Sequence, residues 1–247
     1  MAKIVRKNDD LQRQYMKYKE EQKRAFIISG ISFFLWMLNV IFFHSFNPIV
    51  IFVLFVGFGG GAAAGRYLKQ KAEIYRSGAE GENATAEIIA SLPDTYCGFQ
   101  NVKITFDGKM SELDMVVVGP TGVFIIETKN LNGTIVGNYD NPQWVQKKIG
   151  QQGTPYSKSF YNPTKQVGTH VYRLANYLRS NGCSVHVNDM VYFSNPDTVV
   201  QLLGTPTKTP VFSALGNSGR DICNYILRNE QQISENVVYQ IKRLLNE

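Results

Sequence analysis

Residues 112–130 read ELDMVVVGPTGVFIIETKN, and this stretch decides the fold. Two continuously apolar runs, Met115–Val118 and Val123–Ile126, lie on either side of a Gly-Pro-Thr-Gly turn at 119–122. Glycine and proline favour a tight turn, and unbroken apolar runs of this length are typical of strands that are covered on both faces. The stretch therefore predicts two neighbouring strands inside a sheet, with helices packed on both sides.

The sequence on either side of this stretch supplies the other elements of an α/β domain. Strands are expected near 97–106, 110–118, 185–193 and 210–213, and helices near 82–92, 163–179, 219–229 and 234–245. Pro93 ends the first of these helices and Asn181-Gly182 closes the second. The order of helix, strands, helix and strand predicts one mixed sheet with helices on its faces.

Acidic residues interrupt the two apolar strands at their ends. Asp114 begins the run DMVVV, and Glu127 and Lys129 end the run VFIIETK. Glu127 and Lys129 are two residues apart, so on a strand they project from the same face. Asp114 lies on the neighbouring strand, and neighbouring strands are about 4.8 Å apart. The carboxylates of Asp114 and Glu127 can therefore reach one divalent ion. Carboxylate oxygens without a matching set of histidines or cysteines favour Mg²⁺ or Mn²⁺ over zinc.

Composition excludes several other classes of protein. Hydrophobic residues make up 44% of the 247 residues and charged residues 19%, which excludes a disordered chain. Three well-separated cysteines exclude a disulfide scaffold, and the three histidines lack the spacing of metal ligands. Residues 1–76 carry 12 basic and 5 acidic residues, whereas residues 77–247 carry 14 and 15. The net charge of +6 is therefore no sign that the globular part binds nucleic acid.

Two uncharged segments precede the domain. Residues 25–43 and 49–65 hold no charged side chain, and a short link at 44–48 joins them. Nineteen helical residues span roughly 28 Å, close to the thickness of a bilayer core. We expect a helical hairpin that crosses the membrane twice; a pair of buried helices in a soluble core is the alternative. A signal peptide fits poorly because 24 residues precede the first segment and a second one follows.

Basic residues flank both segments, and the link between them has no lysine or arginine. This pattern predicts a multi-pass protein of the cell membrane with both termini in the cytoplasm. Gly57, Gly61 and Gly65 line one helix face, which predicts close helix packing, either within the hairpin or in a homo-oligomer. The basic flanks are Lys3, Arg6, Lys7, Arg13, Lys17, Lys19, Lys23 and Arg24 before the first segment, and Arg66, Lys69, Lys71 and Arg76 after the second.

Four motifs in order resemble the nuclease-related domain (NERD) of the PD-(D/E)XK nuclease superfamily. They are GAEGE at 78–82, the stretch 112–130, Gly-Thr-Ile at 133–135 and Asn-Pro-Thr-Lys-Gln at 162–166. The resemblance is strongest over 78–180. It implies a restriction-endonuclease-like mixed sheet flanked by helices, a divalent metal and hydrolysis of phosphodiester bonds.

The resemblance also implies roles for single residues. Asp114 and Glu127 would be metal ligands, the carbonyl of Thr128 could add another, and Glu82 would help through water. Lys129 would orient or activate the attacking water, and Gln166 would be an accessory polar residue.

Ordinary structural roles remain open for each of these residues. Glu127 and Lys129 also suit a salt bridge at a strand end, Asp114 a turn cap, and Glu82 the first turn of a helix. Gln166 also suits a helix surface. Aromatic and basic residues that follow the motif suit either packing and solvation or contacts with bases and phosphates: Trp144, Tyr156, Phe160, Tyr161, Lys147, Lys148, Lys158 and Lys165.

The expected organisation is a basic segment at 1–24, a membrane hairpin at 25–65, a linker or helix extension at 66–77 and a NERD-like domain at 78–247. The expected function is a membrane-anchored, cytoplasm-facing, Mg²⁺-dependent nuclease that acts on DNA, or on RNA. The alternative is a non-catalytic module with a nuclease-like fold that binds nucleic acid or a protein at the membrane. The near-neutral charge of 77–247 keeps this alternative open.

Overall fold

The computed structural model describes residues 1–6, 9–43, 47–150, 153–206, 208–216 and 218–246. Residues 44–46 of the expected link and Lys7 of the basic flank lie outside this range. The chain divides into two compact units, one comprising Asp9–Ala79 and the other Met1–Asn8 with Glu80–Glu247.

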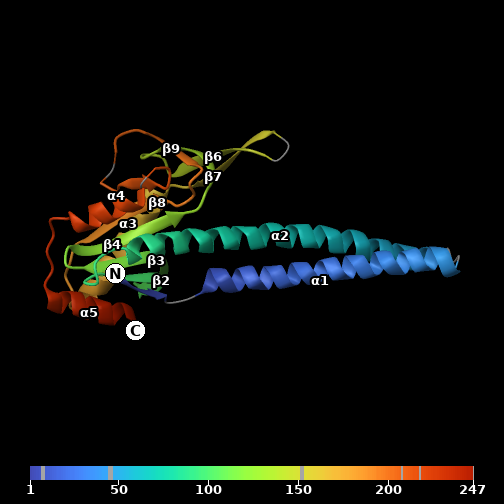
Figure 1. The fold of residues 1–247 in the computed structure, drawn as a ribbon, viewed down its shortest axis with the longest axis horizontal. Coiled ribbons are helices and arrows are strands. Elements are labelled where there is room, and N and C mark those ends of the chain that lie inside the picture. The colour runs from blue at the N-terminus through green and yellow to red at the C-terminus, as the bar shows by residue number, and fades with distance from the viewer. Residues whose placement is uncertain (7–8, 44–46, 151–152, 207, 217, 247) are drawn as a thin grey trace. The chain divides into compact units, whose positions relative to one another are not determined.

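The Asp9–Ala79 unit is a helical hairpin. Helix α1 (Asp10–Leu38) is followed by the π-helical turn η1 (Asn39–Phe43), and helix α2 (Pro48–Ala90) returns alongside α1 (Figure 1). Both helices are long and apolar enough to cross a membrane, and only 6% of the most apolar window in each is buried. Residues 66–77 continue α2 without a break, so they form a helix extension.

The glycine face of α2 packs against α1 of the same chain. A Cβ on Gly61 would lie 2.8 Å from the Ala25 carbonyl oxygen, and one on Gly65 would lie 2.7 Å from the Phe26 ring. Nearby, Ser29 Oγ donates a 2.8 Å hydrogen bond to the Phe58 carbonyl. Glycine allows this close approach because it has no side chain. These contacts agree with the expected packing within the hairpin, and the homo-oligomer through this face stays a prediction.

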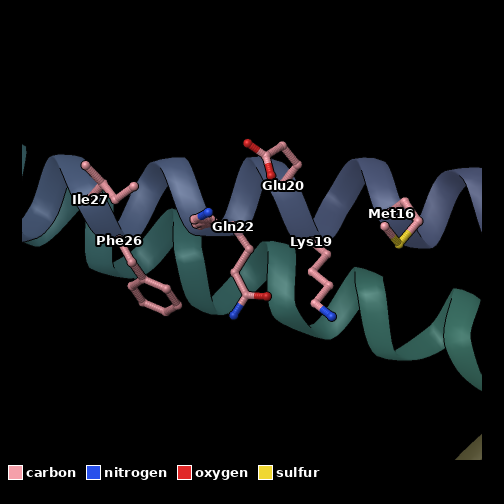
Figure 2. Close-up of a pocket in the computed structure, with 7 residues that line it drawn as sticks. Met16, Lys19, Glu20, Gln22, Phe26 and Ile27 are labelled. Carbon is pink, nitrogen blue, oxygen red and sulfur yellow. The ribbon is translucent and has the colours of Figure 1, made fainter.

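The charged and uncharged parts of α1 meet near residue 24. Figure 2 shows Lys19 and Glu20 on one side of this boundary and Phe26 and Ile27 on the other. An open surface cavity of about 660 Å³ lies along this segment. None of the acidic site residues expected from the sequence lines it.

The second unit contains two mixed sheets. The first has the order β1-β2-β3-β4-β8-β10 and the second the order β7-β6-β5-β9. The first sheet consists of β1 (Lys3–Arg6), β2 (Cys97–Phe106), β3 (Lys109–Gly119), β4 (Gly122–Lys129), β8 (Val187–Phe193) and β10 (Val211–Ser213). The second consists of β5 (Gly133–Asn138), β6 (Gln143–Ile149), β7 (Pro155–Tyr161) and β9 (Thr198–Leu203).

Helices cover both faces of the first sheet, as the apolar runs predict. Val116, Val118 and Ile125 point into one core, which α3 (Pro163–Ser180) and α5 (Glu235–Asn246) close. Their neighbours Val117 and Phe124 point into the other core, which the end of α2 and α4 (Ser218–Leu227) close. Alternate residues of one strand thus enter opposite cores, which is why neither run contains a polar residue.

Two features of this unit differ from the sequence-based expectation. The expected single sheet is accompanied by a second one, whose strands are rich in polar residues and glycine and therefore resemble loops. Strand β1 lies inside the expected basic segment and pairs in parallel with β2, so that Lys3 faces Cys97. No local pattern could indicate this pairing, because the helical hairpin separates the two strands in the sequence.

Candidate metal-dependent active site

The site lies where β3 and β4 separate. The two strands pair from Gly119 with Gly122 as far as Met115 with Ile126, whereas β3 continues to pair with β2 beyond that point. Asp114 is the next residue of β3, and its Oδ2 accepts a 2.8 Å hydrogen bond from the backbone amide of Thr128. Beyond the last pair of residues, each of the two central strands carries one carboxylate, Asp114 on β3 and Glu127 on β4.

Lys129 joins two other polar side chains of the site. Its Nζ donates hydrogen bonds to Glu127 Oε1, at 2.7 Å, and to Gln166 Oε1, at 3.1 Å. The Glu127 side chain is 1% exposed and that of Lys129 is 23% exposed. The ion pair expected from the sequence is therefore present, and it is buried among other polar groups rather than free at a strand end.

Helix α2 brings Glu82 to the same place from the other side of the sheet. Thr85 Oγ1 and Thr128 Oγ1 are 2.8 Å apart, which joins this helix to β4. A Cβ on Gly81 would lie 2.8 Å from Asn130 Cβ and 2.8 Å from Ser194 Oγ. The glycine of the GAEGE motif is thus required for the close approach that places Glu82 beside the strands.

Strand β1 supports the backbone at Glu82 through Arg6. From the sequence, Arg6 was expected only as one of the basic residues that flank the hairpin. Arg6 donates hydrogen bonds to Asn83 Oδ1 and, at 3.3 Å, to Gln100 Oε1. Gln100 Nε2 in turn donates a 3.0 Å hydrogen bond to the Glu82 carbonyl. The charge of Arg6 also lowers the pKa of Glu82, although burial outweighs it.

Electrostatics connect the three acids to one another. Burial, and then the charge of Asp114, raises the pKa of Glu82 to about 7. Burial, and then the charge of Glu127, raises the pKa of Asp114 to about 8. Burial also raises the pKa of Glu127. The positive charge of Lys129 lowers this pKa, and the negative charge of Glu82 raises it. Each carboxylate is thus destabilised by burial and by a like charge nearby, which a cation would relieve.

One further residue of the site, His170, was not predicted from the sequence, although its spacing from Gln166 could have indicated it. His170 lies four residues after Gln166 on α3, and this spacing places both on one helix face. His170 Nε2 lies 3.5 Å from Glu127 Oε2. Burial, with the charges of Arg173 and Lys129, lowers the pKa of His170 to about 4. The imidazole is therefore neutral at pH 7, and the contact is polar rather than ionic.

The three acids are electrostatic neighbours but do not form a closed cage. Within the described parts of the chain, no three histidine, cysteine, aspartate or glutamate side chains converge closely enough to hold a metal ion by themselves. Glu127 Oε2 is buried and has no hydrogen-bond partner among the described residues. Any ion here would have to combine the carboxylates of Asp114 and Glu127 with a backbone carbonyl and water.

The aromatic residues that follow the motif divide into two groups. Trp144 is fully buried and packs against Tyr139, Phe160 and Phe193. Tyr156 and Tyr161 are 49% and 52% exposed. Packing therefore accounts for the first group, and contact with a ligand stays open for the second.

Fold and site together define a mixed α/β domain with an acid-x-Lys strand end at its centre. Residues 77–194 match the family model of the nuclease-related domain, NERD, which confirms the resemblance found in the motifs. An uncharacterized protein of Bacillus anthracis is 32% identical over 96 residues, which are 38% of this chain and 43% of that protein.

One solved structure is also similar to this chain. It is Can2 from Sulfobacillus thermosulfidooxidans in complex with cyclic tetra-adenylate, with 15% identity and a TM-score of 0.26. The similarity covers 72% of this chain and 40% of that chain. The chain thus spans less than half of the length of each of these two proteins.

Proposed function

We propose that the protein is a membrane-anchored nuclease of restriction-endonuclease-like fold that hydrolyses phosphodiester bonds of DNA with Mg²⁺ or Mn²⁺. One observation carries this proposal. Three acids from α2, β3 and β4 raise one another's pKa beside Lys129, inside the segment that matches the nuclease-related domain. Glu127 is buried and Glu82 and Asp114 are half-buried, and the nearby cations are Lys129 and, beside Glu82, Arg6. Three acids against these two cations leave room for a further positive charge, which a divalent ion would supply.

The donor set fits a hard divalent cation. Asp114 and Glu127 offer carboxylate oxygens, one of which lacks a hydrogen-bond partner among the described residues, and Thr128 offers its carbonyl. Glu82 completes the set through water. These are the oxygen ligands that Mg²⁺ and Mn²⁺ prefer. Such a cation supplies charge neutralisation at the scissile phosphate and acidification of the attacking water.

The remaining residues orient the reactants. Glu127 and Gln166 hold the Lys129 ammonium between them, so its Nζ has a defined position beside the attacking oxygen. A cation there stabilises the negative charge that develops in the transition state. His170 stands behind Glu127 and limits the positions that its free oxygen can adopt. Rigid strands keep these distances short, and such geometry supplies much of the rate.

The chain connectivity supports the expected membrane topology. Strand β1 precedes the hairpin and β2 follows it, yet the two pair in one sheet. Both ends of the hairpin therefore lie on the same side of any membrane that it crosses, and the basic flanks make this the cytoplasmic side. A reporter fused before Met1 and one fused after Glu247 are both expected to be active in the cytoplasm. A reporter found outside at either end contradicts the topology.

The cleavage test uses the full chain in lipid nanodiscs, because β1 belongs to the domain and a fragment that starts at residue 77 lacks it. Linear, circular and single-stranded DNA and RNA are incubated with Mg²⁺, Mn²⁺ or EDTA. We expect metal-dependent cleavage of DNA that Asp114→Ala and Lys129→Ala abolish. Asp189→Asn, an acid on β8 outside the site, and Lys109→Ala, at an exposed strand end, are the matched controls.

The absence of a closed three-acid cage in the described residues favours one other candidate, a non-catalytic binding module. In that case the folded protein binds nucleic acid or a protein partner, shows no cleavage, and has the same thermal stability with and without Mn²⁺. Cleavage that survives both site substitutions would also contradict the proposal, because it would not depend on Asp114 or Lys129.

A further inference from the structure

The second sheet extends into a two-stranded ribbon formed by β6 and β7. Strand β5 pairs with β6 from Val145 to Lys147, and β6 and β7 then continue as a pair as far as Ile149 with Pro155. Figure 1 shows this hairpin projecting beyond the rest of its sheet. The name β6–β7 ribbon is used below for residues 143–161, of which 151–152 lie outside the described range.

The ribbon has an unusual charge for this domain. Residues 143–161 contain three lysines, Lys147, Lys148 and Lys158, and no aspartate or glutamate. The whole of residues 77–247 carries 14 basic and 15 acidic residues, so the domain outside the ribbon is net negative. None of the three lysines forms an ion pair with a residue that the structure describes. The ribbon is therefore a local concentration of uncompensated positive charge.

The lysines occupy both faces of the ribbon. Gln146 pairs with Lys158 and Lys148 with Tyr156, so Lys148 and Lys158 are diagonal neighbours on one face, together with Tyr156. Lys147, between Gln146 and Lys148 in the sequence, projects from the other face. The charge of Lys158 contributes, after burial, to lowering the pKa of Lys148. The two ammonium groups thus repel one another, and a polyanion would relieve this repulsion.

Exposed side chains at the end of the ribbon suit contact with a ligand. Ile149 is 78% exposed and Tyr156 is 49% exposed. Much of their surface is open to solvent, in contrast to Trp144 at the base, which is fully buried. Aromatic rings and lysines together are typical of surfaces that contact nucleic acid.

The base of the ribbon adjoins the candidate active site. Lys147 pairs with Thr134 on β5, and Thr134 follows Lys129 by five residues in the sequence. At its other end the ribbon leads through Tyr161 into Asn162, whose side chain caps α3, the helix that carries Gln166 and His170. Both strands of the ribbon are thus linked, through β5 and through Asn162, to the elements that carry Lys129, Gln166 and His170.

We propose that the β6–β7 ribbon docks duplex DNA by entering the major groove, with its lysines on the phosphates of both strands. The major groove of B-form DNA is wide enough for a two-stranded ribbon, whereas that of A-form RNA is too narrow. A ribbon in the groove is flanked by a phosphate backbone on each side, which matches lysines on both of its faces. This proposal deepens the proposed nuclease function by naming the substrate duplex, but it is tested by binding alone.

The test measures the binding of the full chain, in nanodiscs of phosphatidylcholine only, to a fluorescent 30-base-pair duplex in EDTA. The variant is the triple substitution Lys147→Gln, Lys148→Gln and Lys158→Gln. The control removes the same charge elsewhere, by Lys109→Gln, Lys208→Gln and Arg228→Gln. Lys148 is half-buried and the other five side chains are exposed, so both proteins are expected to fold, which thermal unfolding verifies.

We expect the ribbon variant to bind about tenfold more weakly or worse at low salt, and the control to bind like the unaltered protein. The slope of log K against log salt should decrease in magnitude by about 2–3, since each phosphate contact contributes about 0.9. Equal affinity of the variant and the unaltered protein would overturn the proposal, as would a failure of the unaltered protein to bind duplex DNA.

Equal or tighter binding of single-stranded DNA or duplex RNA would also overturn it. If the ribbon variant binds anionic vesicles more weakly than the unaltered protein but binds DNA equally well, the ribbon contacts the membrane surface instead of DNA. Cleavage is recorded separately with Mn²⁺. A protein that binds DNA through the ribbon without cutting it refutes the nuclease function and leaves the ribbon proposal intact, so the two failures are distinguishable.

Discussion

Asp114 accepts a 2.8 Å hydrogen bond from the backbone amide of Thr128, at the point where β3 and β4 cease to pair. A side chain thus takes the place of a strand partner for that amide. The carboxylate is held in the gap between two central strands, one position beyond the last backbone pair. Its Oδ1 atom and the Thr128 carbonyl are the groups on which we expect a divalent ion to bind.

Mn²⁺ should stabilise the folded protein by binding to Asp114 and the Thr128 carbonyl. A ligand at 100 times its dissociation constant stabilises a folded protein by about 2.7 kcal/mol, which corresponds to roughly 5–10 °C in Tm for a domain of this size. Asp114→Asn should remove this shift, yet fold normally, because its amide oxygen still accepts the hydrogen bond from Thr128. Asp189→Asn is the control and should keep the shift. Thermal unfolding with Mn²⁺ or EDTA measures it, and a persistent shift in Asp114→Asn would exclude Asp114 as a ligand.

Lys129 should contribute to stability mainly through its contact with Glu127. Lys129→Met leaves a fully buried carboxylate without its cation and should cost about 3 kcal/mol in EDTA. The double variant Glu127→Gln with Lys129→Met should recover most of this loss, because the buried charge is removed together with its partner. Denaturation of all four proteins gives the coupling energy. Additive effects would show that the two groups do not depend on one another in the metal-free protein.

Gly81 should be intolerant of a side chain. Ala at this position would place a Cβ 2.8 Å from Asn130 and Ser194, so α2 must move away from the strands and carry Glu82 with it. We expect a loss of about 1–3 kcal/mol and a large loss of cleavage. Gly168→Ala on α3, where a Cβ meets no atom within 4 Å, is the matched control. It should stabilise the protein slightly, because alanine is the better helix former. Equal effects of the two substitutions would contradict the packing role of Gly81.

Asp189 should make stability depend on pH. Burial raises its pKa, although Thr209 donates a 2.8 Å hydrogen bond to its Oδ2. Because the folded state binds this proton more tightly than the unfolded state, stability is lost as pH rises from the usual aspartate pKa through the raised one. Asp189→Asn removes this dependence and keeps the acceptor for Thr209. Its Tm should equal that of the unaltered protein at low pH and exceed it at neutral pH. A difference that shrinks as pH rises would contradict the assignment.

The helical hairpin should tolerate a leucine at Gly59 but not at Gly61. Gly61→Leu would drive a side chain into the Ala25 carbonyl and separate the two helices, whereas a Cβ on Gly59 meets no atom within 4 Å. We expect Gly61→Leu to lower the Tm of the detergent-solubilised hairpin and to weaken cross-linking between cysteines placed on α1 and α2. Gly59→Leu should behave like the unaltered protein. Intact cross-linking in Gly61→Leu would mean that α1 and α2 do not pack on this face.

Much of the first sheet was predictable because its pattern is local. The apolar runs around 119–122 indicated two central strands, and the alternation of Val116 and Val117 between two cores confirms coverage on both faces. The polar strands β5, β6 and β7 gave no such signal. Their exposed faces carry serine, lysine and glutamine, and the pairing of β5 with β9 joins residues more than 60 positions apart.

The sequence by itself determined which residues could bear chemistry: an acid before one apolar run, and an acid and a lysine after the next. It did so because side-chain alternation and the avoidance of buried charge act over a few residues. Only the tertiary structure decided that Gln166 and His170 of α3 meet Lys129 and Glu127, and that β1 braces the helix of Glu82. These contacts depend on long-range strand pairing and helix packing, whose partners no local pattern specifies.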